Sequence, residues 1–367
     1  MLYQKKNKSI IYFSPHSNNN YSHCRFLFLT MSKIVKKEIY LLAPENFYSK
    51  VNPHQFFQLK KGMKFNVLNN NIFIKILKTV FFIHQSICNT LVIYKVVKKI
   101  NSKNIILLIE GYKPFDIFFI SLFSNKNFKI RILYENFNFN FFLNLIQNIS
   151  FYLMRKLNKN LQIVEHSNFL KKKSKIINGK IINQPLHSLF KTQKNKNIGN
   201  NILLPGSYRS EKGFNNMKKI INYKAIPGYS FFLNYNSKKE IIMRKKIFFF
   251  KNNLSYKDYL RLLKRSNFVL LPYTHKVYEY NISGIFTDCV LMNKIPIVHK
   301  DMLCAKLLKK NKLKILLYNF YDHKNFYSKI KLINNRRKEI QRNMIIFKKR
   351  YLDYFSDPAV FWNNIFN

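Results

Sequence analysis

Short apolar runs alternate with longer segments of helical periodicity along the whole chain, and this alternation restricts the possible folds more than any other feature. In the first half, the strand-like runs are residues 10–14, 38–43, 64–68, 105–109, 129–133 and 161–164. Helical periodicity marks residues 21–35, 72–100, 116–124, 140–157 and 167–173. Strands that alternate with helices are typical of a parallel sheet covered by helices.

The same series begins again after a polar stretch. Residues 191–201 are rich in Lys and Asn and lack apolar periodicity, as a linker does. Further strand-like runs are residues 201–205, 229–234, 246–251, 268–271, 296–299 and 314–317. Helices are expected near 213–222, 255–266, 284–292, 302–310 and 320–350. The sequence therefore predicts an α/β protein with two doubly wound, Rossmann-like domains, residues 1–190 and 200–350, with ligands bound where the strand order reverses.

The chain is strongly basic, with a formal net charge of +49 from 65 Lys and Arg against 16 Asp and Glu. Such an excess can indicate an anionic partner, either a nucleic acid or a membrane surface. The plainer reading is that Lys, like the abundant Asn, Ile, Phe and Tyr, is encoded by A/T-rich codons, so codon composition raises the charge along the whole chain. Only 11 of the basic residues are Arg, whose guanidinium fork is the usual partner of nucleic-acid phosphates. We therefore expect no nucleic-acid partner. Electrostatic binding to an anionic membrane surface is favoured, near residues 140–159, where aromatics adjoin Arg155 and Lys156.

Cysteine spacing and apolar segment lengths bear on the compartment. The four cysteines are far apart in sequence, which indicates neither a disulfide framework nor a zinc site. The uncharged segments 79–94 and 136–154 fall short of the roughly 20 predominantly apolar residues of a membrane span. No Asp-x-Asp and no His or carboxylate cluster at metal spacing is present. We expect a cytoplasmic protein, peripheral on the inner face of the plasma membrane, with no metal or cofactor.

Two turns carry the signature of phosphate binding. Ser283-Gly284-Ile285 stands between a strand-like run and a helix-like segment, so the free N–H groups of a helix start can hold a diphosphate there. Upstream, a short basic turn from Gly206 to Lys212, with Arg209 between them, joins another strand to another helix. Two anion sites after two strands predict a nucleotide-diphosphate site, although a solvated basic turn is the plainer alternative for the second.

These motifs resemble those of two-domain GT-B glycosyltransferases, closest to glycosyltransferase family 4. Lys212 and Gly213 are similar to that family's lysine–glycine turn, and Arg209 stands two positions after the usual arginine. The resemblance implies two Rossmann-like domains facing a central cleft, with donor diphosphate bound by the turns just described. It also implies a C-terminal helix, residues 351–367, that crosses back to the N-terminal domain and is anchored by Trp362.

The resemblance further assigns the donor sugar and nucleotide. Tyr273 follows the strand in the family's Pro-Tyr position and is expected at the nucleotide. The family has two acidic residues eight positions apart. Asp288 matches the second, whereas the first falls on Tyr280, with Glu279 adjacent. We expect Asp288 to bind the ribose and Glu279 to take the catalytic sugar contact. A helix first-turn aspartate is the alternative reading of Asp288.

In the N-terminal half the corresponding positions are less typical. His16 and Ser17 follow the first strand, where the resemblance places the acceptor loop, and asparagines replace its glycines. Glu110 stands where family members carry a histidine that contacts the donor sugar, so it is a candidate catalytic base or sugar ligand. A loop acid with a structural role is the alternative. His23 and His166 are further candidates of the same kind.

The sequence thus predicts a metal-independent enzyme that transfers a sugar from a nucleotide-diphosphate donor to a saccharide or lipid-linked acceptor of a surface polysaccharide or lipopolysaccharide. Retention of anomeric configuration is implied by the resemblance alone. The nucleotide sugar is a co-substrate, and no cofactor is expected. A catalytically silent GT-B-like binding or scaffold protein is the alternative, suggested by Tyr280 in an acidic position.

Overall fold

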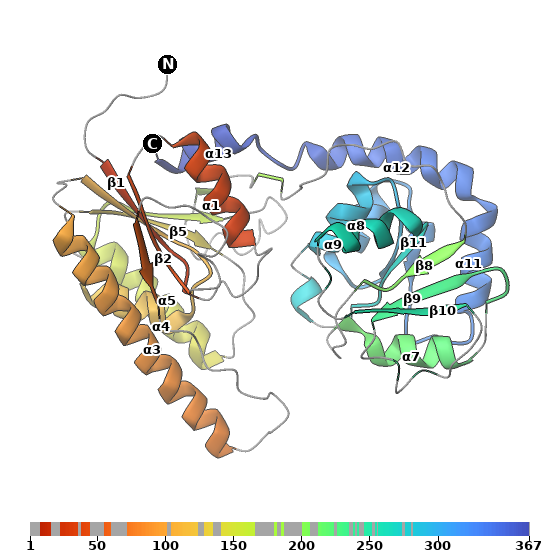
Figure 1. Cartoon of the computed structure of the whole chain (residues 1–367), viewed down its shortest axis with the longest axis horizontal. Helices are drawn as coiled ribbons and strands as arrows, with labels where there is room; N and C mark the ends of the chain where they lie inside the picture. The colour runs from red at the N-terminus through yellow and green to blue at the C-terminus, as the bar shows by residue number, and fades with distance from the viewer. Residues whose placement is uncertain are drawn as a thin grey trace. The chain divides into compact units, whose positions relative to one another are not determined.

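A computed structural model describes the chain in segments that together contain most of both predicted domains (Figure 1). The described residues are 8–15, 23–35, 38–44, 55–59, 72–100, 104–123, 128–134, 141–165, 180–181, 185–186, 200–205, 212–223, 226–234, 238, 241, 246–251, 254, 256–273, 276–279 and 282–366. They divide into two compact units. Unit 1 comprises Met1–His187 and Phe355–Asn367, and unit 2 comprises Ser188–Tyr354.

Unit 1 is built on a parallel sheet with the strand order β3-β2-β1-β4-β5-β6-β7. Its strands are β1 (Lys8–Phe13), β2 (Ile39–Ala43), β3 (Gln55–Gln58), β4 (Asn104–Ile109), β5 (Phe128–Tyr134), β6 (Leu161–Glu165) and β7 (Lys180–Ile181). The central strand β4 is a continuous apolar run from Ile105 to Ile109, because its side chains are buried on both faces of the sheet.

Helices cover both faces of this sheet. Ile11 and Phe13 of β1 belong to a core that includes side chains of α3 (Ile72–Lys99), α4 (Pro114–Phe123) and α5 (Phe141–Leu157). Ile10 and Tyr12 face the opposite way, into a core shared with α1 (His23–Ile34) and α13 (Pro358–Phe366). Alternate residues of one strand thus supply two cores, as the period of two requires.

The C-terminal helix α13 belongs to unit 1, although unit 2 precedes it in sequence (Figure 1). Phe361, Trp362 and Ile365 are fully buried in the α1-side core. The Trp362 indole N–H donates to Thr30 Oγ1 at 3.1 Å, and the buried Arg131 Nε of β5 donates to the carbonyl of Ile365 at 2.9 Å. This helix is therefore fixed to unit 1 by apolar burial and by hydrogen bonds to two different elements.

Unit 2 contains a second parallel sheet, with the order β10-β9-β8-β11-β12-β13. Its strands are β8 (Asn201–Leu203), β9 (Ser230–Asn234), β10 (Ile247–Phe250), β11 (Phe268–Leu271), β12 (Ile295–His299) and β13 (Leu317–Tyr318). The connecting helices are α7 (Phe214–Tyr223), α8 (Tyr256–Arg265), α9 (Gly284–Leu291) and α10 (Leu303–Lys310). Helices α11 (Phe326–Asn335) and α12 (Arg337–Leu352) follow β13. Two parallel sheets in doubly wound order confirm the predicted α/β class.

Two sequence expectations need correction, and two others fall outside the described residues. The edge strand beside β2 is residues 55–58, whose outer residues are both Gln and hide the apolar pattern. The strand expected at 64–68 and the helix expected at 167–173 lie outside the described residues. The helix expected over 320–350 is two helices, because Arg336, with φ of −99° and ψ of 16°, interrupts it.

Helix α3 agrees with the helix predicted over residues 72–100. It spans 28 residues, and Thr79–Lys99 is long and apolar enough to cross a membrane by length and composition alone. The expectation that this segment is shorter than a membrane span was wrong, because the helix continues through Lys95, Lys98 and Lys99. Ile93 and Val96 of the same helix are buried in the core of unit 1, so α3 is a covering helix of the sheet.

Candidate functional site

In unit 2 the strand order reverses between β8 and β11, because β8 is followed by β9 on one side and β11 by β12 on the other. Ligands of doubly wound sheets bind outside the carboxyl ends of the strands at such a reversal. The segments that leave β8 and β11 contain most of the residues expected at the donor: Lys212, Tyr273, Glu279, Ser283, Gly284, Ile285 and Asp288. The sequence motifs and the topology therefore indicate the same edge of the sheet.

The two segments contact one another directly. Gly213 has a φ of +73°, and a Cβ added to it would lie 1.8 Å from the carbonyl oxygen of Pro272. Only glycine permits both that backbone conformation and so close an approach. The neighbouring Lys212 places its ammonium 5.5 Å from the centre of the Tyr273 ring. A cation is thus held between the segment after β8 and the segment after β11.

Tyr273 is almost completely buried beneath this contact. Its ring centre lies 4.5 Å from that of Tyr278, in the short 3-10 helix η4 (Lys276–Glu279). Burial raises the pKa of the Tyr273 phenol far above its usual range, and the adjacent Ser283 hydroxyl opposes the shift. Tyr273 therefore contributes a packed ring to the floor of the site, with a neutral hydroxyl.

Helix α9 begins at this floor. Ser283 is its N-cap in extended conformation and makes no side-chain capping bond, and the first backbone bond of the turn joins the Thr287 N–H to the Ser283 carbonyl at 3.2 Å. Gly284 is exposed, and a Cβ there would meet nothing within 4 Å. Ile285 packs its side chain against the core of unit 2. The first-turn N–H groups are the usual anion donors of a helix.

Asp288 lies one turn into α9. The hydroxyl of Tyr259 on α8 donates to Asp288 Oδ2 at 2.8 Å. Burial raises the pKa of Asp288 to about 7, and the Tyr259 hydrogen bond opposes that rise. The carboxyl group is therefore tied to α8 through one oxygen, and when it is ionised its other oxygen can accept a hydrogen bond from a ligand hydroxyl group.

Of the remaining residues expected at the donor, the structure describes Glu279 alone. Glu279 ends η4 and is half-buried, in the same β11–α9 connection as Ser283. Gly206 and Arg209 lie outside the described residues, as does Tyr280. The structure thus brings together Lys212, Tyr273 and the start of α9, and Asp288 is part of the same helix.

Unit 1 has its own reversal of strand order, between β1 and β4. Glu110 follows β4 there and is fully buried, with the Tyr12 hydroxyl donating to its carboxyl group. Its backbone N–H donates to the Phe13 carbonyl at 3.0 Å. A carboxyl group enclosed in this way favours the structural reading of Glu110 over the catalytic one. His16, Ser17 and His166 lie outside the described residues, and His23 begins α1.

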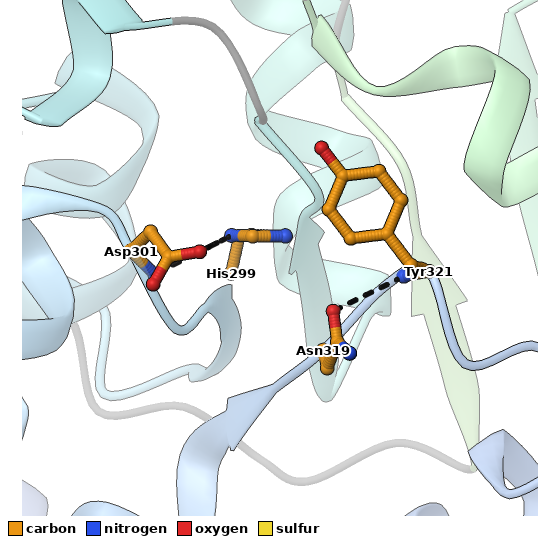
Figure 2. Close-up of polar contacts among 4 residues, drawn as sticks. All are labelled: His299, Asp301, Asn319 and Tyr321. Atoms are coloured by element: carbon orange, nitrogen blue, oxygen red, sulfur yellow. Dashed lines mark hydrogen bonds and ion pairs between the residues drawn. The ribbon is translucent and has the colours of Figure 1, made fainter.

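A histidine that the sequence analysis does not single out lies at the carboxyl ends of the unit 2 strands. His299 ends β12, is buried, and stacks on Phe320 with ring centres 6.2 Å apart. Figure 2 shows its ring between Asp301 and Tyr321, with Nδ1 3.6 Å from Asp301 Oδ2. Burial lowers the pKa of His299, so the imidazole is neutral at pH 7. Its position after an apolar run, at the carboxyl end of a strand, was the available signal.

Among the described residues, no three His, Cys, Asp or Glu side chains come close enough to hold a metal ion. The positive groups of the candidate donor site are Lys212 and the start of α9.

Known proteins resemble this chain in structure but not detectably in sequence. No protein-family model matches the chain, and no curated protein matches it in sequence. Solved structures do match over nearly the full length. A glycosyltransferase from Rickettsia africae matches with a TM-score of 0.60 and 14% identity, over 98% of this chain and 97% of its own. The spinosyn rhamnosyltransferase SpnG in complex with thymidine diphosphate matches with a TM-score of 0.57 and 9% identity, over 98% and 100%.

The chain has the GT-B fold. The fold expected from the resemblance is therefore confirmed. A UDP-N-acetylglucosamine 2-epimerase also matches, with a TM-score of 0.55 and 13% identity over 92% of this chain and 91% of its own. The GT-B fold thus serves more than one reaction of nucleotide sugars, and the reaction has to be argued from the residues of the site.

Proposed function

We propose that this chain is a glycosyltransferase that moves a sugar from a nucleotide-diphosphate donor to a saccharide or lipid-linked acceptor. The observation that carries the proposal is the contact of the two segments at the strand reversal of unit 2. Gly213 closes on Pro272, and Lys212 lies against Tyr273. A lysine and a helix start, both after strands that flank the reversal, suit a diphosphate.

The chemistry required is stabilisation of a leaving group. As the bond between the anomeric carbon and the β-phosphate oxygen breaks, negative charge develops on the diphosphate, while the acceptor oxygen bonds to the sugar and passes its proton to the departing diphosphate oxygen. The Lys212 ammonium and the first-turn N–H groups of α9 would lower the energy of that charge. We propose that no metal takes part and that configuration is retained, as the family resemblance implies.

Asp288 is proposed to hold the ribose through the carboxyl oxygen that Tyr259 does not occupy. Glu279 is proposed to contact the donor sugar, because it lies in the connection from β11 to α9. Gly206 and Arg209 would add contacts to the diphosphate, and His16 and Ser17 to the acceptor. Unit 2 is the proposed nucleotide-sugar domain and unit 1 the proposed acceptor domain.

The pathway is proposed to be synthesis of a surface polysaccharide or lipopolysaccharide at the cytoplasmic face of the plasma membrane. The resemblance of the β8 and β11 segments to those of glycosyltransferase family 4 supports this placement. No nucleic-acid partner is proposed, because Arg supplies only 11 of the 65 basic residues.

A panel of nucleotide sugars tests the proposal. Wild-type protein should be stabilised against thermal unfolding by a nucleoside diphosphate more than by the matching nucleoside, and the preferred nucleotide sugar should be consumed when acceptor glycans are added. Binding without transfer or hydrolysis of any donor would favour the silent scaffold. Interconversion of epimers without an acceptor would assign the reaction of the matched epimerase. Equal stabilisation by nucleoside and nucleoside diphosphate would refute the diphosphate site.

A further inference from the structure

Helix α3 exposes a straight apolar stripe on its outer side. Val80, Ile87, Leu91 and Tyr94 are each between 37% and 58% exposed, at the spacing of one helix face. Buried residues of the helix, among them Asn89 and Ile93, lie on the opposite face. The exposed His84 lies on the same side, between Val80 and Ile87. Exposed large apolar side chains occur singly on most proteins, but a row of four along one helix marks a contact surface.

Helix α5 repeats the arrangement. Phe142, Leu145, Ile149 and Tyr152 are each between 43% and 58% exposed, again at spacings of three and four residues. The buried residues Gln147, Ser150, Phe151 and Met154 occupy the other side of the helix.

Both stripes point to the same side of unit 1. Helices α3, α4 and α5 share the core on one face of the sheet, and α4 packs against each of the other two (Figure 1). Leu122 of α4 is 52% exposed and extends the apolar area between them. We call this surface, formed by the outer sides of these helices, the α3–α5 face. At 1.5 Å per residue the α3 stripe is about 20 Å long.

The charges of the α3–α5 face are all positive. Helices α3 and α5 contain no acidic residue, and the single acid of α4, Asp116, is buried. Each stripe ends in a tyrosine followed four residues later by a lysine whose ammonium lies over the ring. The Lys98 Nζ is 4.6 Å from the centre of Tyr94, and the Lys156 Nζ is 5.0 Å from the centre of Tyr152. All three helices connect parallel strands, so their C-termini, and these two pairs, lie toward the same edge of the sheet.

We propose that the α3–α5 face docks on the surface of a lipid bilayer that contains anionic lipids. Leu, Ile and Phe side chains would enter the boundary between headgroups and acyl chains, the tyrosines would lie at headgroup level, and the lysines would contact lipid phosphates. The inference does not rest on the proposed transfer reaction, because it uses no residue of the donor site. It extends the surface expected from residues 140–159 to a second, longer helix.

Two other occupants fit less well. A second copy of the chain would bring together two faces without acids, in a protein of net charge +49, and like charges oppose such pairing. A spanning α3 would have to leave the sheet, and this would expose the apolar surface that Ile93 and Val96 bury. Docking keeps the inner side of the helix in its core and covers only the outer side.

The test compares variants of the full chain by sedimentation with vesicles. One set of vesicles is pure phosphatidylcholine, and the other is an equal mixture of phosphatidylcholine and phosphatidylglycerol. Wild-type protein should bind the mixture and should bind it less at high salt. Lys98→Gln with Lys156→Gln should lower the partition coefficient by about fivefold for each lysine removed. Leu91→Ser with Ile149→Ser should lower it by about tenfold with an unchanged midpoint of thermal unfolding, because both side chains are nearly half exposed.

Matched controls are essential, because a chain with 65 basic residues will be attracted to anionic vesicles through any surface. Lys309→Gln with Lys310→Gln removes the same charge from the exposed end of α10, and Ile345→Ser with Ile346→Ser removes equally exposed apolar side chains from α12. Both control pairs should bind as wild type. The tryptophan emission of Ile149→Trp should shift to the blue on the mixed vesicles, whereas that of Ile346→Trp should not.

Several outcomes would overturn the proposal. Control variants that lose as much binding as the face variants would show that net charge alone drives association. Absence of vesicle binding, with a dimer that Leu91→Ser and Ile149→Ser dissociate, would assign the face to a second copy. Wild-type protein that resists extraction by both high salt and alkaline carbonate would indicate an inserted α3.

Discussion

Gly213→Ala isolates the contact on which the donor site depends. The new Cβ would lie 1.8 Å from the Pro272 carbonyl oxygen, so the segments after β8 and β11 must separate. A residue other than glycine at a φ of +73° costs about 1–2 kcal/mol. Displacement of a packed backbone costs a further 1–3 kcal/mol or so. The free energy of unfolding of unit 2 should therefore fall by about 2–5 kcal/mol.

Gly228→Ala supplies the matched control. Gly228 has a φ of +80°, but a Cβ there would meet nothing within 4 Å. Gly228→Ala should therefore lower the free energy of unfolding by the conformational cost alone, about 1–2 kcal/mol, with no steric clash. The difference between the two variants measures the close approach alone. The gain from restricting the unfolded chain is common to both and cancels.

Circular dichroism during urea unfolding reports on both units, whereas the fluorescence of Trp362, the sole tryptophan, reports on unit 1. Gly213→Ala should lower the unfolding midpoint of unit 2 and leave the fluorescence transition in place. The affinity for a nucleoside diphosphate should also fall, because Lys212 moves with its neighbour. Equal losses of stability in Gly213→Ala and Gly228→Ala would refute the reasoning.

Four further predictions concern the same site. Lys212→Ala should weaken binding of a nucleoside diphosphate tenfold or more in titration calorimetry, since a charge-assisted contact is worth about 1.5–3 kcal/mol, and unchanged affinity in a folded variant contradicts the assignment. Gly284→Val should abolish transfer with little change in unfolding midpoint, because the new side chain enters open space in the protein but keeps the backbone away from the ligand. Ser283→Ala should reduce transfer less. Wild-type activity in Gly284→Val would refute the phosphate site. Asp288→Asn should cost more activity than Glu279→Gln, and the reverse order reassigns the acidic pair. Burial raises the folded-state pKa of Asp288 from 3.8 to about 7. Between these two pH values the folded protein holds a proton that the unfolded chain has lost. The free energy of unfolding contributed by this group therefore falls as pH rises from about 4 to about 7. Asp288→Asn should therefore be more stable relative to wild type at pH 8 than at pH 5, and a constant difference would contradict the burial of this carboxyl.

The sequence was sufficient for the fold class and for the start of α9. Runs such as Phe268–Leu271 and Ile295–His299 are apolar throughout because both faces of a parallel strand are buried, and that pattern is local. Ser283 and Gly284 stand at the predicted junction because a helix start has its own local signature. Edge strands lack such a signal, and β3, with glutamine at each end, was missed for that reason.

Contacts between distant segments could not be predicted. Gly213 approaches Pro272, and Tyr259 donates to Asp288, across 59 and 29 positions that no local pattern connects. The burial of Glu110 has the same origin, because its enclosure depends on Tyr12 of a strand 98 positions earlier. A sequence motif can place a carboxylate after a strand, but whether that carboxylate meets solvent depends on the packing around it.

The docking of α13 on unit 1 has a consequence for the order in which the protein matures on the ribosome. Phe361, Trp362 and Ile365 complete a core whose other members, such as Leu27 and Phe28, emerge more than 300 residues earlier in synthesis. All of Ser188–Tyr354 is translated in between. At about 5–20 residues per second, the early apolar surface waits roughly 17–67 seconds for its cover. Unit 2 can therefore finish folding before unit 1, and the nascent N-terminal half is the natural client of a ribosome-associated chaperone.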